Sequence, residues 1–279
     1  MKKFWKTANF RLKAGLIITC FFMIVGFVVY FFPHQDPFTF NTYPNNLGAS
    51  GEHWLGTTSM GQDVVWLLIE AVHNSLLIGL IVATIGTVVG VLVGLLAGFV
   101  GGVFDRILMI ITDTFVVIPS LPILILMTSL MKGKSTVVVM ALVLALFAWA
   151  WPSRQIRSMA LTIKERDFIH TARFSGESTL QIVVTEILPF ALSWSLSNFM
   201  NATLSAIGSE SSLAVLGLSP GNLVSLGNMI QWARNYNAVL AGRWLWIGAP
   251  IVATVILFVG LFMLITGYND YQAKKRGRG

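Results

Sequence analysis

Charge is scarce in this sequence. Only 11% of its 279 residues are Asp, Glu, Lys or Arg, whereas 55% are hydrophobic. Soluble domains carry roughly 25% charged residues, so a water-soluble fold could not cover its surface with so few. Cysteine is also nearly absent, because Cys20 stands alone and no disulfide can form within the chain. These shortages indicate an integral membrane protein.

The net charge is +7 and the pI is near 9.8, a balance that also occurs in nucleic-acid-binding proteins. Such proteins gather Lys and Arg on one folded face. Here the basic residues stand between apolar runs, so membrane orientation explains them better. We therefore expect contact with membrane lipid and no nucleic-acid partner.

Six apolar segments are long enough to cross a bilayer as helices, which takes roughly 20 residues. They cover residues 14–32, 75–99, 107–131, 135–151, 189–218 and 246–267. Pro119 and Pro122 interrupt the third, and the polar stretch 208–212 interrupts the fifth. Such breaks survive in a membrane only where protein or water satisfies the backbone. The sequence predicts an all-α membrane protein with about six transmembrane helices.

The first segment could be mistaken for a signal peptide because five basic residues precede it. Its 19 apolar residues exceed the ~7 to 15 of a cleavable apolar core, and no small-x-small cleavage site follows. We expect it to be retained as a span.

The distribution of Lys and Arg predicts the orientation, because cytoplasmic loops are enriched in them. Fifteen of the 19 would lie on the side of the two termini if the six segments span. Both termini are therefore predicted to be cytoplasmic. The expected parts are a tail (1–13), a first span (14–32), an extracytoplasmic segment (33–74), a five-helix core (75–267) with a cytoplasmic loop (153–188), and a basic tail (268–279).

Small residues mark one face of the second span. Gly86, Gly90, Gly94 and Gly98 recur at intervals of four. Bare faces of this kind let a second helix approach closely in a membrane. The partner could be another span of this chain or a span of another subunit.

The loop 153–188 exceeds a simple connection. It is predicted to form a helix over about 161–174, a turn at Gly176, and a second helix begun by Ser178 and Gln181, which have capping-box spacing. Pro189 would open the fifth span. Such a hairpin could dock on a soluble partner or could be a solvated amphipathic loop.

The stretch from Asp167 to Gly176, followed by Ile187-Leu188-Pro189, resembles the EAA loop of binding-protein-dependent ABC importer permeases. His170 and Thr171 occupy the usual Glu and first Ala positions, whereas Ala172, Gly176, Leu188 and Pro189 match.

Two further stretches resemble the second permease of the dipeptide, oligopeptide and nickel subfamily. One is Leu-Gly-Thr-Thr-Ser-Met-Gly-Gln-Asp-Val at 55–64, in which Gln62 replaces the usual Arg. The other is Glu-Ser-Ser-Leu-Ala-Val-Leu-Gly-Leu at 210–218. The likeness covers nearly the whole chain.

The resemblance implies a type I ABC importer permease of a bacterial or archaeal cytoplasmic membrane. It implies a second permease, one or two ATPase subunits that bind ATP and Mg, an extracytoplasmic substrate-binding protein, and no cofactor in this chain. The cargo would be short peptides or similar solutes, with an oligosaccharide as the alternative. The ATPase-coupling residues would be Asp167, His170, Thr171, Ala172, Arg173, Gly176, Leu188 and Pro189. Gly176 would allow a sharp turn, and Ala172 would let one face seat in an ATPase groove.

A polar stripe follows one face of the fifth span: Asn198, Asn201, Ser205, Ser209 and Ser212, at spacings of three and four. It could line the translocation path or form interhelical hydrogen bonds. Glu210 is costly at membrane depth and is a candidate for the same path. Its neighbours Ser209, Ser211 and Ser212 could instead satisfy it.

Nothing in the sequence indicates catalysis. Gly133-Lys134-Ser135 resembles the end of a phosphate-binding loop, but the required upstream glycine is Thr128. The four histidines show no metal-ligand spacing, so no metal site is expected. A self-sufficient ion-coupled carrier or channel is the alternative from another class. It would commonly show paired intramembrane acids, for which only Asp113 and Glu210 are candidates.

Overall fold

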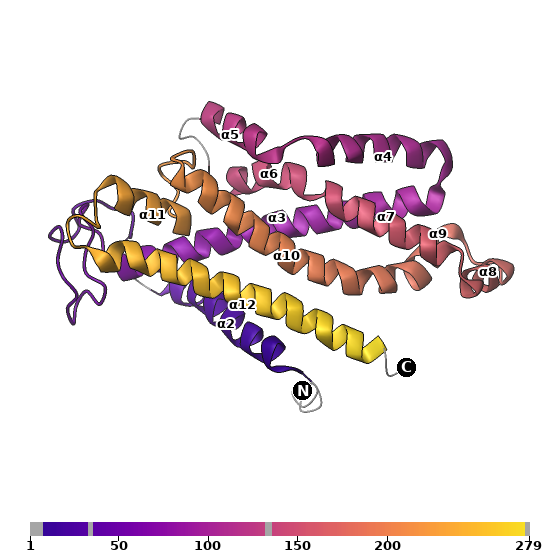
Figure 1. Cartoon of the computed structure of the whole chain (residues 1–279), viewed down its shortest axis with the longest axis horizontal. Helices are drawn as coiled ribbons and strands as arrows, with labels where there is room; N and C mark the ends of the chain where they lie inside the picture. The colour runs from indigo at the N-terminus through magenta and orange to yellow at the C-terminus, as the bar shows by residue number, and fades with distance from the viewer. Residues whose placement is uncertain (1–7, 33–35, 132–135, 277–279) are drawn as a thin grey trace.

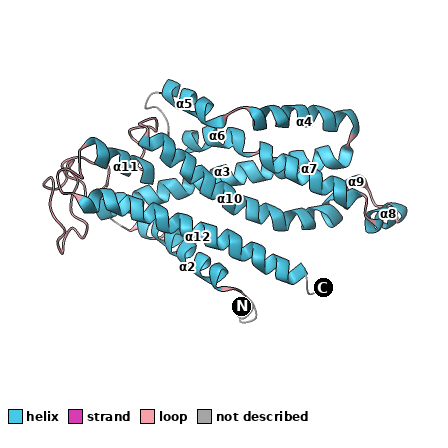
Figure 2. Ribbon diagram, viewed as in Figure 1, coloured by secondary structure: helices cyan, strands magenta, loops and turns pink. Residues whose placement is uncertain are grey.

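The computed structural model describes residues 8–32, 36–131 and 136–276 as an elongated helical bundle (Figures 1 and 2). The predicted start of the fourth span at Ser135, the 133–135 motif and the outer ends of both tails lie outside the described residues. The elements are α2 (Phe10–Phe27), η1 (Val29–Phe31), α3 (Val64–Val100), α4 (Gly102–Val117), α5 (Ser120–Met131), α6 (Val137–Ala148), α7 (Ala150–Lys164), α8 (Asp167–Phe174), α9 (Thr179–Ile182), η2 (Val183–Ile187), α10 (Leu188–Val215), α11 (Leu226–Asn235) and α12 (Trp244–Arg276).

Helix α3 is the centre of the bundle and packs against α2, α6, α7 and α10. It begins eleven residues before the predicted start at residue 75. The Asp63 carboxylate accepts hydrogen bonds from the amides of Val65 and Trp66 and caps the helix. The helix continues through polar residues because Asn74 donates to the Val224 carbonyl and Ser75 accepts from the Leu226 amide. Those distant partners could not be predicted from local hydropathy.

The third and fourth predicted spans are both bent pairs of helices. Between α4 and α5 the chain turns by 78°, at the predicted break beside Pro119. Between α6 and α7 it turns by 41°. Helix α7 continues to Lys164, so the first twelve residues of the predicted loop 153–188 are helical and pack against α3.

Two expectations about helix continuity were wrong. The polar stretch 208–212 does not interrupt α10, which is continuous from Leu188 to Val215. The irregularity lies earlier, in the π-helical turn η2, where the Leu188 amide donates to the Val183 carbonyl just before Pro189. The helix predicted over 161–174 is two helices, α7 and α8, separated at residues 165–166.

Among the described residues, three helices are long and apolar enough to span a membrane: α2 with η1, α3 and α12. The number rises to five if each bent pair forms one span. Helix α10 has 28 residues, about 42 Å at 1.5 Å each, but is more polar. The all-α membrane fold class is confirmed, and the role of α10 as the predicted fifth span stays a prediction.

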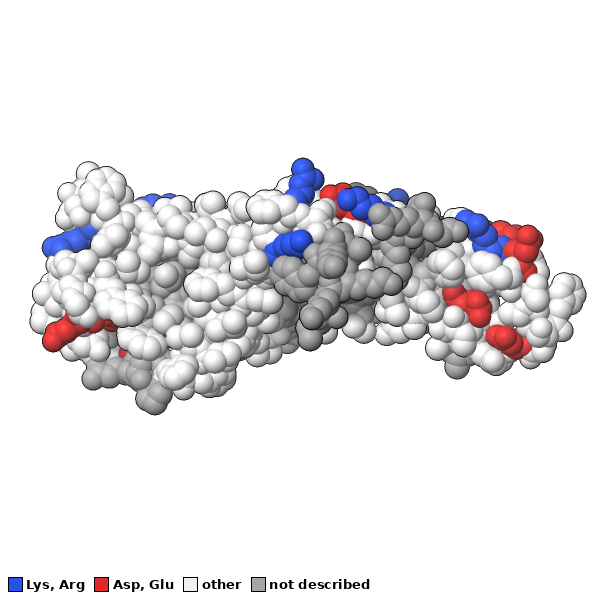
Figure 3. All heavy atoms as spheres, turned by 90° about the horizontal axis from the view of Figure 1, so that it is seen from below, with Lys and Arg blue, Asp and Glu red and all other residues white. Residues whose placement is uncertain are grey.

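The two ends of the bundle differ. Figure 1 shows the 36–63 loop and α11 at one end and α8 with α9 at the other. Seen from below, an uncharged band separates the charges at the 36–63 end from those nearer α8 (Figure 3). That band is what a helical bundle needs in order to cross hydrocarbon.

Candidate translocation cavity and coupling helix

The glycines of α3 form a tight seam with α6 and α7 of the same chain. A Cβ atom added to Gly86 would lie 2.8 Å from the Ala148 Cβ, and one added to Gly90 would lie 2.6 Å from the Pro152 Cβ. Gly94 and Gly98 meet Ser153 and Ala160 equally closely. The sequence left open whether these glycines pack against a span of this chain or of another subunit. All four contact helices of their own chain. The seam fixes the helices that form the cavity described next.

Four residues of the predicted polar stripe, Asn198, Asn201, Ser205 and Ser209 of α10, line one cavity of about 230 Å³. Val82, Leu144, Trp151 and Ser120 contribute from α3, α6, α7 and α5. The amide of Asn198 also donates to the Thr87 hydroxyl of α3, at 3.2 Å. Asn198 therefore lines the cavity and also makes an interhelical hydrogen bond, and the role of the stripe in a translocation path stays a prediction.

Ser212 and Glu210 do not line this cavity. The exposed Ser212 hydroxyl donates back to the Gly208 carbonyl, at 2.8 Å. Glu210 is completely buried, and its Oε1 accepts from the hydroxyls of Ser225, at 2.7 Å, and Ser219, at 3.3 Å.

The Glu210 carboxyl therefore anchors the segment between α10 and α11. Asn228 extends the network by donating to the Ser219 hydroxyl and to the Pro220 and Leu223 carbonyls. The neighbouring serines proposed from the sequence were the wrong partners. The actual ones follow nine and fifteen residues later and were not recognised in the sequence.

Helix α8 is fastened to the bundle by its inner face. Ile169 and Ala172, one turn apart, are buried in a cluster with Leu95 and Phe99 of α3 and Ile156 of α7. Ala172 is therefore small in order to fit against its own chain. The expectation that Ala172 faces an ATPase groove was wrong, because periodicity shows which residues share a face but not which face is covered.

Gly176 ends α8 in a Schellman motif. Its φ is +85°, a conformation in which an L side chain is strained. The Gly176 amide donates to the Arg173 carbonyl, at 3.0 Å, and the Glu177 amide to the Ala172 carbonyl, at 3.2 Å. The Ser178 hydroxyl then accepts from the Gln181 amide, at 3.3 Å, where the capping box was predicted.

The outer face of α8 is exposed. It carries Asp167, His170, Thr171 and Phe174, at spacings of three, one and three. The Phe174 side chain is 91% exposed, although aromatic rings are usually buried. Sequence analysis missed Phe174, and its helical phase opposite Ile169 and Ala172 was the available signal.

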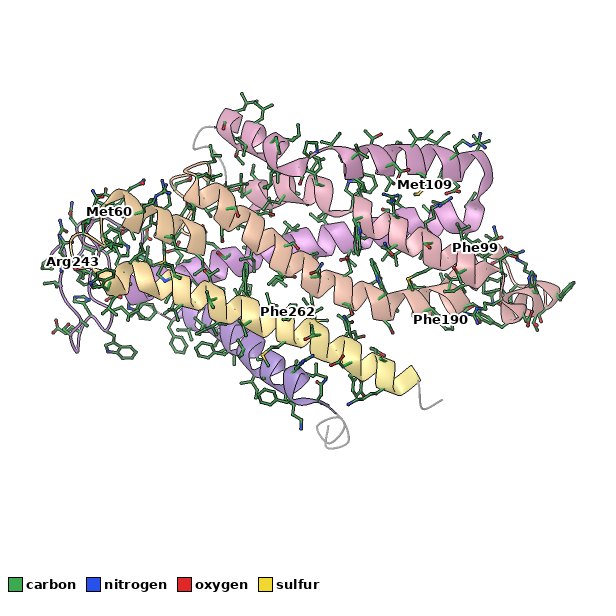
Figure 4. All side chains as sticks on the ribbon, in the orientation of Figure 1. Met60, Phe99, Met109, Phe190, Arg243 and Phe262 are labelled. Atoms are coloured by element: carbon green, nitrogen blue, oxygen red, sulfur yellow. The ribbon has the colours of Figure 1, made fainter. Side chains whose placement is uncertain are left out.

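The remaining coupling candidates lie around this inner face. The Arg173 guanidinium and the Lys164 ammonium both lie over the Phe99 ring, at 5.7 and 5.5 Å from its centre. Figure 4 shows Phe99 and Phe190 toward the α8 end of the bundle. Leu188 is half-buried, and Pro189 follows it in the first turn of α10.

Among the described residues, no group of three His, Cys, Asp or Glu side chains could hold a metal ion.

Comparisons with known proteins agree with this arrangement. Residues 90–278 match the model of the binding-protein-dependent transport system inner membrane component family. The chain is 31% identical over 208 residues to the oligopeptide transport system permease protein OppC of Mycobacterium tuberculosis strain H37Rv, covering 74% of this chain and 70% of that protein. It is 28% identical over 257 residues to OppC of Lactococcus lactis strain IL1403, covering 90% and 87%.

A third relative is the glutathione transport system permease protein GsiD of Pectobacterium atrosepticum. It is 28% identical over 273 residues, and the match covers 96% of this chain and 86% of that protein. Among solved structures, an inward-facing form of the MetNI methionine ABC transporter has a similar fold. Its TM-score is 0.53 at 22% identity, over 75% of this chain and 96% of the matched chain.

Proposed function

This chain belongs to the binding-protein-dependent transport system inner membrane component family. We propose that it forms half of an import path for short peptides. In this proposal, ATPase subunits contact α8 and drive the transport through that contact. The chain is a non-catalytic, multi-pass permease subunit of an ABC importer in a bacterial inner membrane. In the proposal a second permease completes the path, and an extracytoplasmic binding protein delivers the cargo. One or two ATPase subunits bind ATP and Mg.

The observation that carries the coupling role is the two-sided character of α8. Ile169 and Ala172 are packed into the cluster that also joins α3, α7 and α10, whereas Phe174 projects from the opposite face. Close-packed interiors transmit displacement because they resist compression. A force applied to Phe174 would therefore reach three spans at once.

The polar cavity supports the transport role. Two amide and two hydroxyl side chains of α10 offer both donors and acceptors to a solute. Peptide groups carry one donor and one acceptor each, so such a lining suits them. The names of the relatives, which refer to oligopeptide and glutathione transport, support the same cargo class. They lend no support to the oligosaccharide alternative.

The ion-coupled carrier is disfavoured by where its two acidic candidates lie. The Glu210 carboxyl is held by Ser219 and Ser225, and the Asp113 carboxylate lies 3.3 Å from Arg154. Neither carboxyl lines the α10 cavity. The two acids therefore do not form the paired site that such a carrier would use.

Removing the Phe174 ring tests the coupling role. Phe174→Ala should reduce the amount of ATPase that co-purifies with the solubilised permease, because the ring would lose its burial in the partner. An aromatic residue at the centre of an interface typically contributes about 2 kcal/mol or more. The measurement is the ratio of ATPase to permease after affinity purification.

Leu240→Ala is the matched control. Leu240 is also apolar and is 88% exposed, but it lies near the start of α12, at the end of the bundle away from α8. Its truncation should leave the ratio unchanged. Equal ATPase-to-permease ratios for Phe174→Ala and Leu240→Ala would contradict coupling through α8. A purified complex that transports no short peptide would contradict the proposed cargo.

A further inference from the structure

A second cavity, of about 540 Å³, lies between α4 and α7 and is lined by charged residues. Met109 and Asp113 contribute from α4, and Arg154, Gln155, Arg157 and Ser158 contribute from α7. The lining residues of α7 are three and four positions apart and share one face. The motifs that carry the family resemblance do not include these residues, and the sequence singled out Asp113 only, with Glu210, as a candidate acid of an ion-coupled carrier.

Two ion pairs cross between α4 and α7, and they are built differently. Arg157 and Asp105 form a two-pronged pair at 2.5 and 2.7 Å, with side chains that are 33% and 16% exposed. Arg154 and Asp113 are joined by one contact of 3.3 Å, and their side chains are 50% and 53% exposed. The first pair is a structural clamp, because its hydrogen bonds are matched and shielded. The second pair leaves most of its hydrogen-bonding capacity open.

The position of the open pair requires water or a polar partner. Asp113 lies six residues inside the predicted third span, which begins at residue 107, about 9 Å along the helix axis and so within a 30 Å bilayer core. Half-exposed charges at that depth are costly against lipid and usually face a water-filled cavity. The α4–α7 cavity therefore suits a water-filled or polar environment and not contact with lipid.

The charged cavity adjoins the α10 cavity. Trp151 lines both, and its half-exposed ring packs beside that of Trp194, with centres 5.7 Å apart. On one side of Trp151 the lining offers amides and hydroxyls. On the other side it offers the Asp113 carboxylate and two guanidinium groups, of Arg154 and of Arg157, the latter paired with Asp105. A solute that passed Trp151 would go from a neutral polar lining to one with charges of both signs.

We propose that the α4–α7 cavity is a charged station of the translocation path, in which Asp113 binds the ammonium group and Arg154 the carboxylate of a zwitterionic peptide. This inference rests on the proposed function and deepens it. A short peptide carries both charges at neutral pH. Its two ends would replace the single weak contact between Asp113 and Arg154 with two charged contacts. Arg157 stays engaged with Asp105 and keeps α4 in place during the exchange.

Accessibility tests the station without any substrate. Cysteines replace Met109, which lines the cavity from α4, or the adjacent Ile110, which is 61% exposed on α4 outside the cavity, in a Cys20→Ser background. A water-soluble anionic thiol reagent is applied to the assembled importer in inverted membrane vesicles. Met109→Cys should be labelled and Ile110→Cys protected. Equal labelling, or protection of Met109→Cys, would overturn the aqueous station.

Transport tests the assigned roles. Arg154→Gln should lower uptake of tri-alanine per ATP hydrolysed by roughly tenfold or more, because a charged hydrogen bond is lost. Uptake of tri-alanine amide, which lacks the carboxylate, should be unchanged by Arg154→Gln. Arg154→Lys should retain most tri-alanine uptake. Each rate is divided by the rate of the same peptide with the unsubstituted chain.

The two possible failures are distinguishable. Equal losses for the two peptides would overturn the station while leaving the importer assignment intact. An unsubstituted complex that moves neither peptide would overturn the peptide cargo and the station with it. If the unsubstituted complex moves only tri-alanine, the labelling of Met109→Cys decides the proposal.

Discussion

Helices α3 and α4 are both apolar, but they are held in the bundle by different forces. Twenty of the 37 residues of α3 are buried, whereas Thr112 is the only buried residue of the sixteen in α4. Glycines let α3 approach its neighbours to backbone contact. Helix α4 is joined to α7 by its two ion pairs across a cavity. Apolar content predicts that a helix spans, but small-residue spacing predicts which helix is central.

The comparison has a functional meaning. The α3 seam provides the rigid frame to which α8 is attached, and the α4 side leaves room for solute. Both ends of α4 also depart from helical geometry. Gly101 and Gly102 have positive φ angles at its start, and a 78° bend follows its end. Gly94→Leu, Arg157→Gln and Gly176→Ala test this account, in decreasing order of expected effect.

The α3 seam should be the least tolerant place in the molecule. In Gly94→Leu the new Cβ atom would lie 2.6 Å from the Ser153 carbonyl oxygen, a backbone atom that cannot rotate away. We expect destabilisation of about 3 kcal/mol or more, at or above the upper end of typical overpacking costs. Thermal unfolding in detergent measures the effect. Val88→Leu, on the exposed face of the same helix, should be tolerated, and equal melting temperatures for the two variants would show that the seam is not tightly packed.

The attachment of α4 should depend on one ion pair and not the other. Arg157→Gln should cost about 1.5 to 3 kcal/mol because it removes two charged hydrogen bonds from the shielded Asp105. Arg154→Gln should cost less than about 1 kcal/mol because its pair is half-exposed. The same unfolding measurement compares them. A larger loss in Arg154→Gln would reverse the assignment of clamp and station.

The turn after α8 should show a smaller effect than the α3 seam or the Arg157 clamp. Gly176→Ala places an L side chain at φ +85°, which costs about 1 to 2 kcal/mol, although the added Cβ meets no atom within 4 Å. We expect the permease to remain folded and peptide uptake per ATP to fall as α8 shifts. Gly48→Ala, in open space without a positive φ angle, is the control. Uptake that is unaffected by Gly176→Ala would mean that the α8 turn need not be rigid.

Much of the fold follows from the sequence because it depends on local patterns. The apolar runs, the break beside Pro119, the capping of α9 by Ser178 and the shared face of Asn198, Asn201, Ser205 and Ser209 are all set by composition or spacing. The failures concern contacts between distant segments. The partners of Glu210, the early start of α3 and the inward face of Ala172 each depend on residues that only the folded chain brings near.

The central claim is that ATPase subunits move this bundle by contact with the outer face of α8. Photo-crosslinking from a cysteine-attached probe tests it most directly, with Phe174→Cys compared with Asn46→Cys in a Cys20→Ser background. Asn46 lies in the 36–63 loop at the opposite end. We expect Phe174→Cys to crosslink to an ATPase subunit and Asn46→Cys not to do so. Two results would contradict the claim. One is labelling of Phe174→Cys by a reagent applied to the outside of intact cells, and the other is a probe on Phe174→Cys that captures no ATPase subunit in the assembled complex.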